Sequence, residues 1–188
     1  MRSTYSGVSR SGGDPLAVSD KLLALFVSQL AQISHIKRLR FHTRLAIVMP
    51  ERITDEFIHW LTHLTLQPVI VVHANHPNEI NDDVKQAMLK LRNAGIPLLN
   101  QTVLLKEVND DVSVLKELSE VLFAAGVLPY YLHVLDKVQG AAHFDLPLER
   151  ALMLHAELSE ALSGYLVPKL VCEQAGEPSK TLLGSASW

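Results

Sequence analysis

The sequence alternates amphipathic helical stretches with short apolar runs, and this alternation constrains the fold more than any other feature. Apolar residues recur at helical spacing in the segments 21–34, 54–64, 81–94, 109–125 and 147–162. Between them we expect strands within 36–42, 68–76, 96–105 and 127–136. This order favours βαβ units with a parallel sheet. About four or five such units are too few for an eight-stranded barrel, and they fit part of a barrel or a doubly wound sheet.

Local signals predict where the helices begin and end. Thr54, Asn81 and Asn109 have side chains that cap free N–H groups at the start of a helix. Gly95 and Gly126 follow the last apolar position of their helices, where a backbone of positive φ favours glycine. In the first helix, the spacing predicts one buried stripe made of Leu22, Leu23, Phe26, Leu30 and Ile33.

Charge and cysteine content exclude several classes of protein. The 188 residues have a formal net charge of −3 at pH 7, which argues against a surface for nucleic acid or an anionic membrane. No apolar run approaches the ~18 residues of a membrane span. The single cysteine, Cys172, excludes a disulfide framework and fits a cytoplasmic protein. It also excludes a metal or iron–sulfur site made only of this chain's cysteines, and we predict no metal ligands.

Polar residues follow each predicted strand, where the carboxyl ends of parallel strands bind ligands in α/β folds. Helix capping and turn formation explain any one of them equally well, but a pocket needs several donors and acceptors together. His73 and His76 are spaced i, i+3 on a strand end, which favours hydrogen bonding over shared metal ligation. The set consists of Gly12, Gly13, Asp14, His42, Arg44, His73, Asn75, His76, Asn100, Gln101, His133 and Asp136.

A second loop with glycine and proline, GEPSKT at 176–181, carries one lysine, Lys180. A solvated lysine on an ordinary turn explains this pattern. An amine on a shaped loop beside a cleft can also form a Schiff base with an aldehyde cofactor. The residues alone leave both explanations open.

Six segments stand in a fixed order between Ser11 and Thr181: SGGDPL, RLRFHTRLAIVMPERIT, HANHPNEI, AGIPLLNQTVLLKEVND, PYYLHVLDKVQGAAHF and SGYLVPKLVCEQAGEPSKT. Together they resemble the lysine 2,3-aminomutase family of radical S-adenosylmethionine (SAM) enzymes. The stretches VLDKVQGAAHF and GEPSK resemble the branch that makes (R)-β-lysine for attachment to elongation factor P.

The resemblance implies an α/β fold, a partial parallel (β/α)6 radical SAM barrel that here lacks its first βα unit. It implies three cofactors, namely a [4Fe–4S] cluster, SAM and pyridoxal phosphate. In this family a 5′-deoxyadenosyl radical takes hydrogen from the β-carbon of L-lysine, and the α-amino group, held as an imine to pyridoxal phosphate, moves to that carbon. The implied partners are L-lysine and, indirectly, the elongation factor P pathway, with no nucleic acid and no membrane.

The resemblance also assigns roles by position. Lys180 matches the lysine that forms the Schiff base with pyridoxal phosphate. Asp136 and Glu173 match two acids that hold the distal ammonium of the substrate, although the family often has aspartate at the second position. The residues that match the SAM site are Gly12, Gly13 and Asp14, with His73 and Gln101 as further contacts.

The chain departs from the family at the cluster motif CxxxCxxC, which belongs upstream of SGGDP. Without those cysteines the cluster has no ligands. We therefore expect the C-terminal part of such an enzyme, from a truncated or disrupted reading frame and inactive alone. The expected division is a non-native or disordered leader at 1–10, the barrel part with its lysine segment at 11–181, and a tail at 182–188.

Two further expectations follow from an incomplete barrel. An unpaired edge at Ile36–Phe41, or at a remnant strand before Gly12, favours oligomers or aggregation. A non-catalytic fragment, or an interaction module with a vestigial pocket, is the main alternative to an enzyme. An unrelated α/β cofactor-binding enzyme is a third hypothesis, which the ordered matches disfavour. An in-frame CxxxCxxC segment upstream of Met1 would favour the enzyme.

Overall fold

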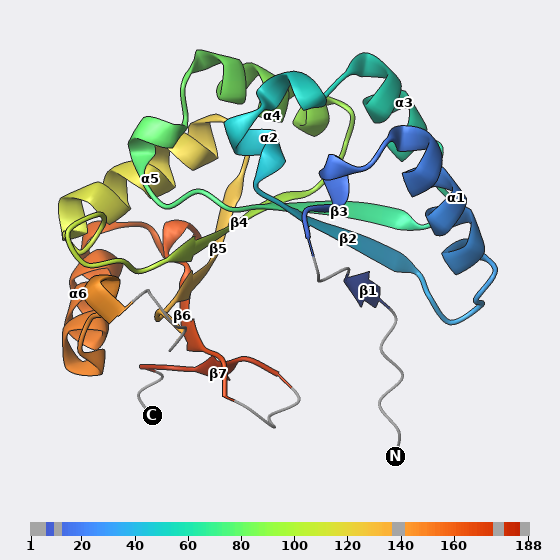
Figure 1. Ribbon diagram of the computed structural model, residues 1–188. Helices are drawn as coiled ribbons and strands as arrows, with labels where there is room; N and C mark the ends of the chain where they lie inside the picture. Colours follow the sequence, from blue (N-terminus) through green and yellow to red (C-terminus); the bar gives the residue numbers. More distant parts are fainter. Residues whose placement is uncertain (1–6, 10–12, 137–141, 175–178, 185–188) are drawn as a thin grey trace. The chain divides into compact units, whose positions relative to one another are not determined.

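The computed structural model describes residues 7–9, 13–136, 142–174 and 179–184. Strands and helices alternate along the chain as the sequence predicts (Figure 1). The chain divides into two compact units, Met1–His73 with Asn81–Leu99, and Ala74–Ile80 with Asn100–Trp188. We call them unit 1 and unit 2 and describe each by itself. Among the described residues, no helix has the length and apolar character needed to cross a membrane.

Unit 1 contains a parallel arrangement of strands in the order β1 (Gly7–Ser9), β2 (Arg38–Thr43) and β3 (Gln67–Val72). Strands β2 and β3 pair over their whole length, from Arg38 opposite Gln67 to Thr43 opposite Val72. The chain then enters β4 (Leu98–Val103), which has residues in both units. The helical elements of unit 1 are η1 (Pro15–Ala17), α1 (Asp20–Ala31), α2 (Leu45–Val48), η2 (Pro50–Arg52), α3 (Asp55–Thr62) and α4 (Asp82–Asn93).

Several predicted features of unit 1 are confirmed. The Thr54 hydroxyl accepts a hydrogen bond from Phe57 N at 3.0 Å and starts α3. Asn81 caps α4 in the same way, and Gly95 follows this helix at φ 78°. The apolar end of β3 is buried at every position from 70 to 72, as expected for a strand covered on both faces.

The buried face of α1 differs from the predicted stripe. Leu23 and Val27 are 1% and 2% exposed, whereas Leu22, Phe26 and Ile33 are 60%, 38% and 40% exposed. The prediction was therefore right for Leu23 and wrong for the last three residues. Apolar residues lie around most of this helix, so their spacing alone does not select the face that packs.

The first strand also differs from expectation. Residues 7–9, which fall in the expected leader, form β1 and pair in parallel with Arg38–Arg40 of β2. Of the two edges that were expected, Ile36–Phe41 is therefore not the unpaired one, and the remnant strand before Gly12, which is β1, stands at the end of the strand order of unit 1. Backbone hydrogen bonds hold such a strand without apolar side chains, so its composition of glycine, valine and serine gave little signal.

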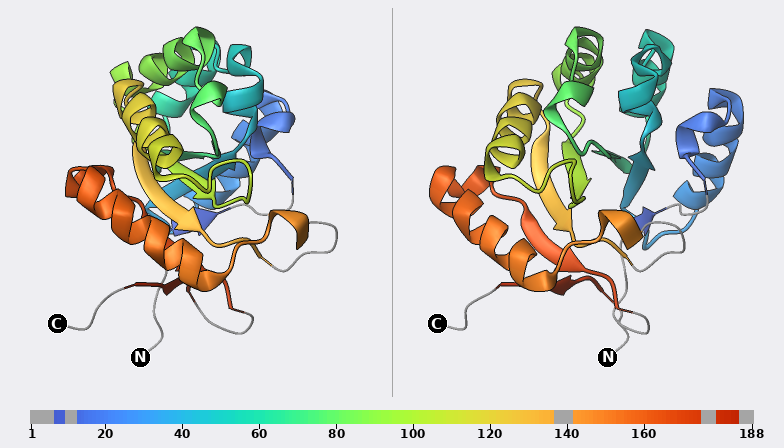
Figure 2. Two further views of the ribbon diagram at one scale, coloured as in Figure 1. Left: turned by 90° about the vertical axis from the view of Figure 1, so that its left-hand side faces the viewer. Right: turned by 60° about the vertical axis from the view of Figure 1, so that its left-hand side comes forward.

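Unit 2 contains β5 (Leu128–His133) and β6 (Lys169–Cys172) as a parallel pair, and β7 (Thr181–Leu182) runs antiparallel to β6. Its helical elements are η3 (Pro77–Glu79), α5 (Val112–Ala124), η4 (Ala142–Phe144), α6 (Leu148–Ala161) and η5 (Gly164–Leu166). Helix α6 lies beside β6 (Figure 2). The core between these elements is mainly leucine: Leu104, Leu115, Leu132, Leu146, Ala151, Leu154, Leu158 and Leu170.

Candidate functional site

The glycine turn of unit 1 is held by the carboxylate of Asp14. Its Oδ1 accepts from Leu16 N at 2.9 Å and from Thr43 Oγ1 at 2.8 Å. Its Oδ2 accepts from Arg44 N at 2.7 Å and Leu45 N at 3.0 Å. Asp14 thus caps η1 and also binds the backbone where β2 passes into α2, joining two segments that are far apart in the sequence.

Electrostatics agree with this structural role. Burial of Asp14 disfavours its charged form, but the hydrogen bonds from Leu45, Leu16, Thr43 and Arg44 outweigh that effect and hold the pKa of the carboxyl below its ordinary value. Gly13, which precedes it, has φ 96°, a conformation that favours glycine. Gly12 lies outside the described residues. The predicted SAM turn is therefore shaped by Asp14, whose oxygens are already engaged by the protein.

Histidines lie at the carboxyl ends of two strands in the same unit: His42 is near the end of β2, and His73 follows β3. The rings of His42 and His73 meet edge to face, with 5.9 Å between centroids and an interplanar angle of 86°. Arg44 Nη1 donates to the backbone oxygen of His73 at 2.8 Å. Three of the predicted contacts, Gly13, Asp14 and His73, therefore belong to one unit, whereas Gln101 belongs to unit 2, where it is buried.

In unit 2, the amide of Asn100 acts as a structural clamp. It accepts from Ala74 N at 2.9 Å and donates to Ala74 O at 3.1 Å and to Thr102 Oγ1 at 2.8 Å. Thr102 Oγ1 donates to the same Ala74 oxygen at 3.0 Å. Asn100 is 1% exposed. A fully buried amide needs partners such as these, and the clamp leaves this side chain no ligand-binding role.

Asn109 is a second buried clamp and not the predicted helix cap. Its amide accepts from Leu105 N at 2.7 Å and donates to the backbone oxygens of Asn75 and Val103 at 2.8 and 2.9 Å. The N-cap of α5 is Asp111, two residues later. Asparagine suits both positions, so the sequence could not separate a cap from a loop clamp.

The segment that holds His76 is also organised by its own side chains. Glu79 Oε1 accepts from Asn75 N at 2.8 Å and from His76 N at 3.1 Å. His76 Nδ1 in turn accepts from Asn78 N at 3.2 Å, which completes a capping box around η3. Within the described ranges no group of three histidine, cysteine or acidic residues is placed to hold a metal ion.

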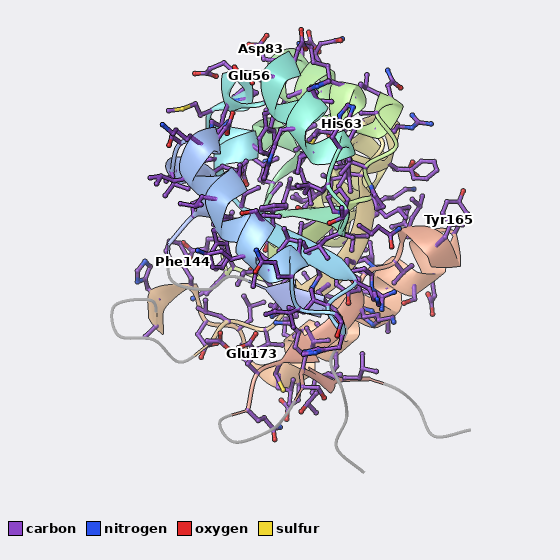
Figure 3. The ribbon with its side chains drawn as sticks, turned by 90° about the vertical axis from the view of Figure 1, so that its right-hand side faces the viewer. Glu56, His63, Asp83, Phe144, Tyr165 and Glu173 are labelled. Carbon is purple, nitrogen blue, oxygen red and sulfur yellow. The ribbon has the colours of Figure 1, made fainter. Side chains whose placement is uncertain are left out.

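The hairpin of β6 and β7 brings two predicted site residues together. Glu173 follows β6 (Figure 3), and Lys180 precedes β7. Lys180 Nζ donates a hydrogen bond to Glu173 Oε1 and forms an ion pair with it. Lys180 Nζ also lies 5.7 Å from the ring centroid of Tyr131 on β5, a cation–π distance. Tyr131 is not among the predicted site residues, and its only signal in the sequence is its place on the strand that leads to Asp136.

The charge of Glu173 is stabilised by its neighbours. The hydrogen bond from Lys180, then the Lys180 charge, and more weakly the charge of His133 hold the pKa of Glu173 below its ordinary value against the opposing effect of burial. The rings of His133 and Tyr131 lie 5.8 Å apart on one face of β5. A lysine amine, a carboxylate and two aromatic rings therefore meet in unit 2.

Asp136 takes no part in the hydrogen bond and ion pair between Glu173 and Lys180. It follows β5 and is exposed, and residues 137–141 beyond it lie outside the described part. Between the described side chains, no hydrogen bond or ion pair joins Asp136 to Glu173 or Lys180. The two predicted acids are therefore in different settings, one paired with a lysine and one exposed.

The chain is similar in sequence to curated proteins over 92% of its length. No model of a known protein family matches the chain. It is 55% identical over 172 residues to L-lysine 2,3-aminomutase of Haemophilus influenzae and 55% identical over 173 residues to that of Escherichia coli. These alignments cover 92% of the chain and 51% of each relative, so the chain spans about half the length of the curated relatives it matches. Glutamate 2,3-aminomutase of Clostridioides difficile is 38% identical, with 41% of its length covered.

Solved structures show the fold. A domain of a pyruvate-formate lyase-activating enzyme from Bacteroides vulgatus has a TM-score of 0.61 at 15% identity, covering 90% of this chain and 100% of that domain. A radical SAM methyltransferase from Sphaerobacter thermophilus has a TM-score of 0.56 at 16% identity, covering 76% of this chain and 43% of its own. The predicted partial radical SAM barrel is confirmed at the level of the fold, and over 92% of its length the chain is similar to curated proteins named L-lysine 2,3-aminomutase.

Proposed function

We propose that this chain carries the amine-handling part of an L-lysine 2,3-aminomutase, an isomerase, in which Lys180 holds pyridoxal phosphate through its amine. The observation that carries this proposal is the setting of Lys180 on the β6–β7 hairpin, beside Glu173 and above the Tyr131 ring. An amine fixed between a carboxylate and an aromatic face fits an aldehyde cofactor with a flat ring. When bound, that cofactor supplies an electron-accepting ring for chemistry at the amine-bearing carbon.

The acidic residues favour lysine over an acidic amino acid as substrate. By the family resemblance, Asp136 and Glu173 each offer a carboxylate to a distal ammonium group, and opposite charges fix the register of such a flexible chain. A distal carboxylate, as in glutamate, would meet like charge there. Lysine should therefore bind in preference to glutamate and to norleucine, which lacks the distal charge.

SAM is proposed to bind at the turn that Asp14 shapes. Because the Asp14 oxygens already accept from the protein, we propose that the backbone of Gly13, together with Gly12 before it in the sequence, contacts the methionine amino group. His73 and Gln101 are proposed as further contacts. Asp14 itself then acts by fixing the turn.

The donor set does not fit a [4Fe–4S] cluster. Its usual ligands are several cysteine thiolates, and the whole sequence contains one cysteine, Cys172. We therefore derive no radical step from this chain and propose that it is inactive alone, which keeps a non-catalytic fragment as the second candidate. Anaerobic reconstitution with iron and sulfide should give no iron–sulfur absorbance, and a bound cluster with aminomutase turnover would contradict this.

The proposed setting is the cytoplasm, and the proposed product is (R)-β-lysine for attachment to elongation factor P. The stretches VLDKVQGAAHF and GEPSK support this branch. A complementation assay tests it, in which β-lysylation of elongation factor P is measured by mass spectrometry in cells that lack their own aminomutase. The chain alone should not restore the modification. A fusion that adds a cysteine-bearing barrel segment from a relative should restore it.

Borohydride trapping tests the proposed role of Lys180. The chain is incubated with pyridoxal phosphate, reduced and mapped by peptide mass spectrometry. Label should concentrate on Lys180 and disappear in Lys180→Ala. Lys169, an exposed lysine at the start of β6, gives the matched control, because Lys169→Ala should leave the label unchanged. Equal labelling of wild type and Lys180→Ala would refute the role.

A further inference from the structure

We propose that Glu173 exchanges a proton with the Lys180 amine during bond formation with the cofactor aldehyde. This inference rests on the proposed function, in which Lys180 is the residue that bonds to that aldehyde. It gives Glu173 a role in addition to holding a substrate ammonium, and it makes Glu173 a catalytic residue for loading and exchange at Lys180.

The contact between the two residues is built into the hairpin. Strands β6 and β7 pair antiparallel with Val171 opposite Leu182 and Cys172 opposite Thr181. The next pair in this register is Glu173 opposite Lys180. Opposite residues in an antiparallel pair lie on the same side, with Cβ atoms about 5 Å apart. The backbone therefore brings the carboxylate to the amine, and the observed Nζ–Oε1 hydrogen bond follows from it.

The neighbouring groups keep the carboxylate ionised, which is the form that can accept a proton. Lys180 and, more weakly, His133 hold the pKa of Glu173 below its ordinary value, so the ionised form predominates at neutral pH. The ring of Tyr131, a residue of β5, contacts the same amine, with 5.7 Å between the ring centroid and Lys180 Nζ. The amine is thus located by a ring and a carboxylate, and the carboxylate is the group placed to take its proton.

The chemistry balances without any further reactant. An ammonium group is not a nucleophile, so Lys180 must first lose a proton, which Glu173 accepts. The neutral Nζ then forms a bond to the aldehyde carbon and carries one proton to the carbonyl oxygen. Glu173 returns its proton to that oxygen, which leaves as water while the second carbon–nitrogen bond forms. The net change is loss of one water, no oxidation occurs, and Glu173 ends ionised.

Asp136 provides a matched comparison. It is the other acid that the family resemblance assigns to the substrate ammonium, and the described contacts do not join it to Lys180. A role in holding substrate predicts similar effects for both acids on lysine binding. A proton-exchange role predicts an effect of Glu173 alone on bond formation at Lys180.

The experiment follows pyridoxal phosphate binding by stopped-flow absorbance, with borohydride mapping to measure the fraction bound at Lys180. Glu173→Gln should slow bond formation at Lys180 about 100-fold, the lower end of general acid–base contributions. Glu173→Asp should recover most of the rate, and Glu160→Gln, at an exposed acid of α6 with no assigned role, should leave it unchanged. The wild-type pH profile should also show a downward break at acid pH where Glu173 protonates, and that break should be absent from the Glu173→Gln profile.

The outcomes separate the two proposals. Wild-type label that does not map to Lys180 refutes the proposed function. Label on Lys180 with equal rates in wild type and Glu173→Gln refutes proton exchange and leaves the function standing. Circular dichroism checks the fold of each variant. If Glu173→Gln does not fold, an acid break that moves to a different pH in Glu173→Asp supports the proposal, whereas a break that stays at the same pH overturns it.

Discussion

Replacing Asp14 by asparagine tests whether its carboxylate shapes the turn of unit 1. The change keeps the size of the side chain but removes the charge, and it turns an NH₂ group toward N–H donors. In the structure the carboxylate receives hydrogen bonds from Leu16, Thr43, Arg44 and Leu45. Asparagine can still accept from two of them through its single oxygen, so the other two lose their acceptor.

The magnitude follows from which donors water can reach. A hydrogen bond to a charged group contributes about 1.5–3 kcal/mol, and an unsatisfied buried donor costs about 1–3 kcal/mol. Arg44 is exposed, so water replaces part of its bond, whereas Thr43 is 1% exposed. We expect a loss of about 2–3 kcal/mol in the free energy of unfolding, or a melting temperature lower by about 5–10 °C for a chain of this size.

The assay is urea and thermal unfolding, followed by far-UV circular dichroism at neutral and acid pH. The matched control is Asp82→Asn on the first turn of α4, where the side chain is 95% exposed; it should change the unfolding free energy by less than about 0.5 kcal/mol. Because the pKa of Asp14 is lowered in the fold, its stabilisation is complete above the unfolded value of about 4 and is lost as pH falls through the folded value.

The difference between wild type and Asp14→Asn should therefore shrink at acid pH. Equal stability of Asp14→Asn and Asp82→Asn at neutral pH would refute the reasoning. So would a difference that grows as the solution becomes more acidic.

Three further predictions concern other parts of the chain. Asn100→Ala should lower the unfolding free energy by about 2–4 kcal/mol, since it leaves the buried Ala74 N–H without its acceptor; a change below about 0.5 kcal/mol in urea unfolding would contradict the clamp. Leu23→Ala should cost about 2–4 kcal/mol by the same measurement, whereas Leu22→Ala on the exposed face of α1 should cost far less; equal losses would contradict the assigned face. The Glu173 carboxyl should titrate below its ordinary range by NMR and return toward it in Lys180→Met; an unchanged midpoint would contradict the ion pair.

The sequence predicted the structure correctly at positions where the residue type fits only one local role, such as a helix cap or a fully buried strand. Thr54 and Asn81 precede apolar helical patterns and cap them, as predicted. The run of Ile70, Val71 and Val72 has no polar face, and the structure buries all three residues. These predictions needed only the sequence on either side of each residue.

Predictions failed where a residue type suits two environments. Asn109 has the side chain of a cap, yet it binds the backbone of Asn75, Val103 and Leu105, and Asp111 caps the helix instead. Leu22 and Leu23 are the same residue type, yet Leu23 is on the buried face of α1 and Leu22 is on its exposed face. Such choices depend on tertiary packing, which outweighs local preference.

The candidate site could be predicted as a list of residues but not as a set of contacts. Polar strand ends marked Asn100, Asn75 and His76 as readily as His73, but the structure uses the first three to hold backbone. The Glu173–Lys180 pair could not be predicted, because it depends on how β7 is aligned with β6. The seven-residue spacing of Glu173 and Lys180 in the sequence does not determine how the two strands are aligned.

The register of the β6–β7 hairpin decides which chemical group stands opposite Glu173. Slippage of β7 by one residue would present Ser179 or Thr181, a hydroxyl, where the structure presents the amine of Lys180. Because pairing lies in the strands, the loop at 174–179 can change length at little cost. Insertions in this loop should therefore be tolerated, while one residue gained or lost within the two-residue strand β7 would replace a nucleophilic nitrogen with an alcohol.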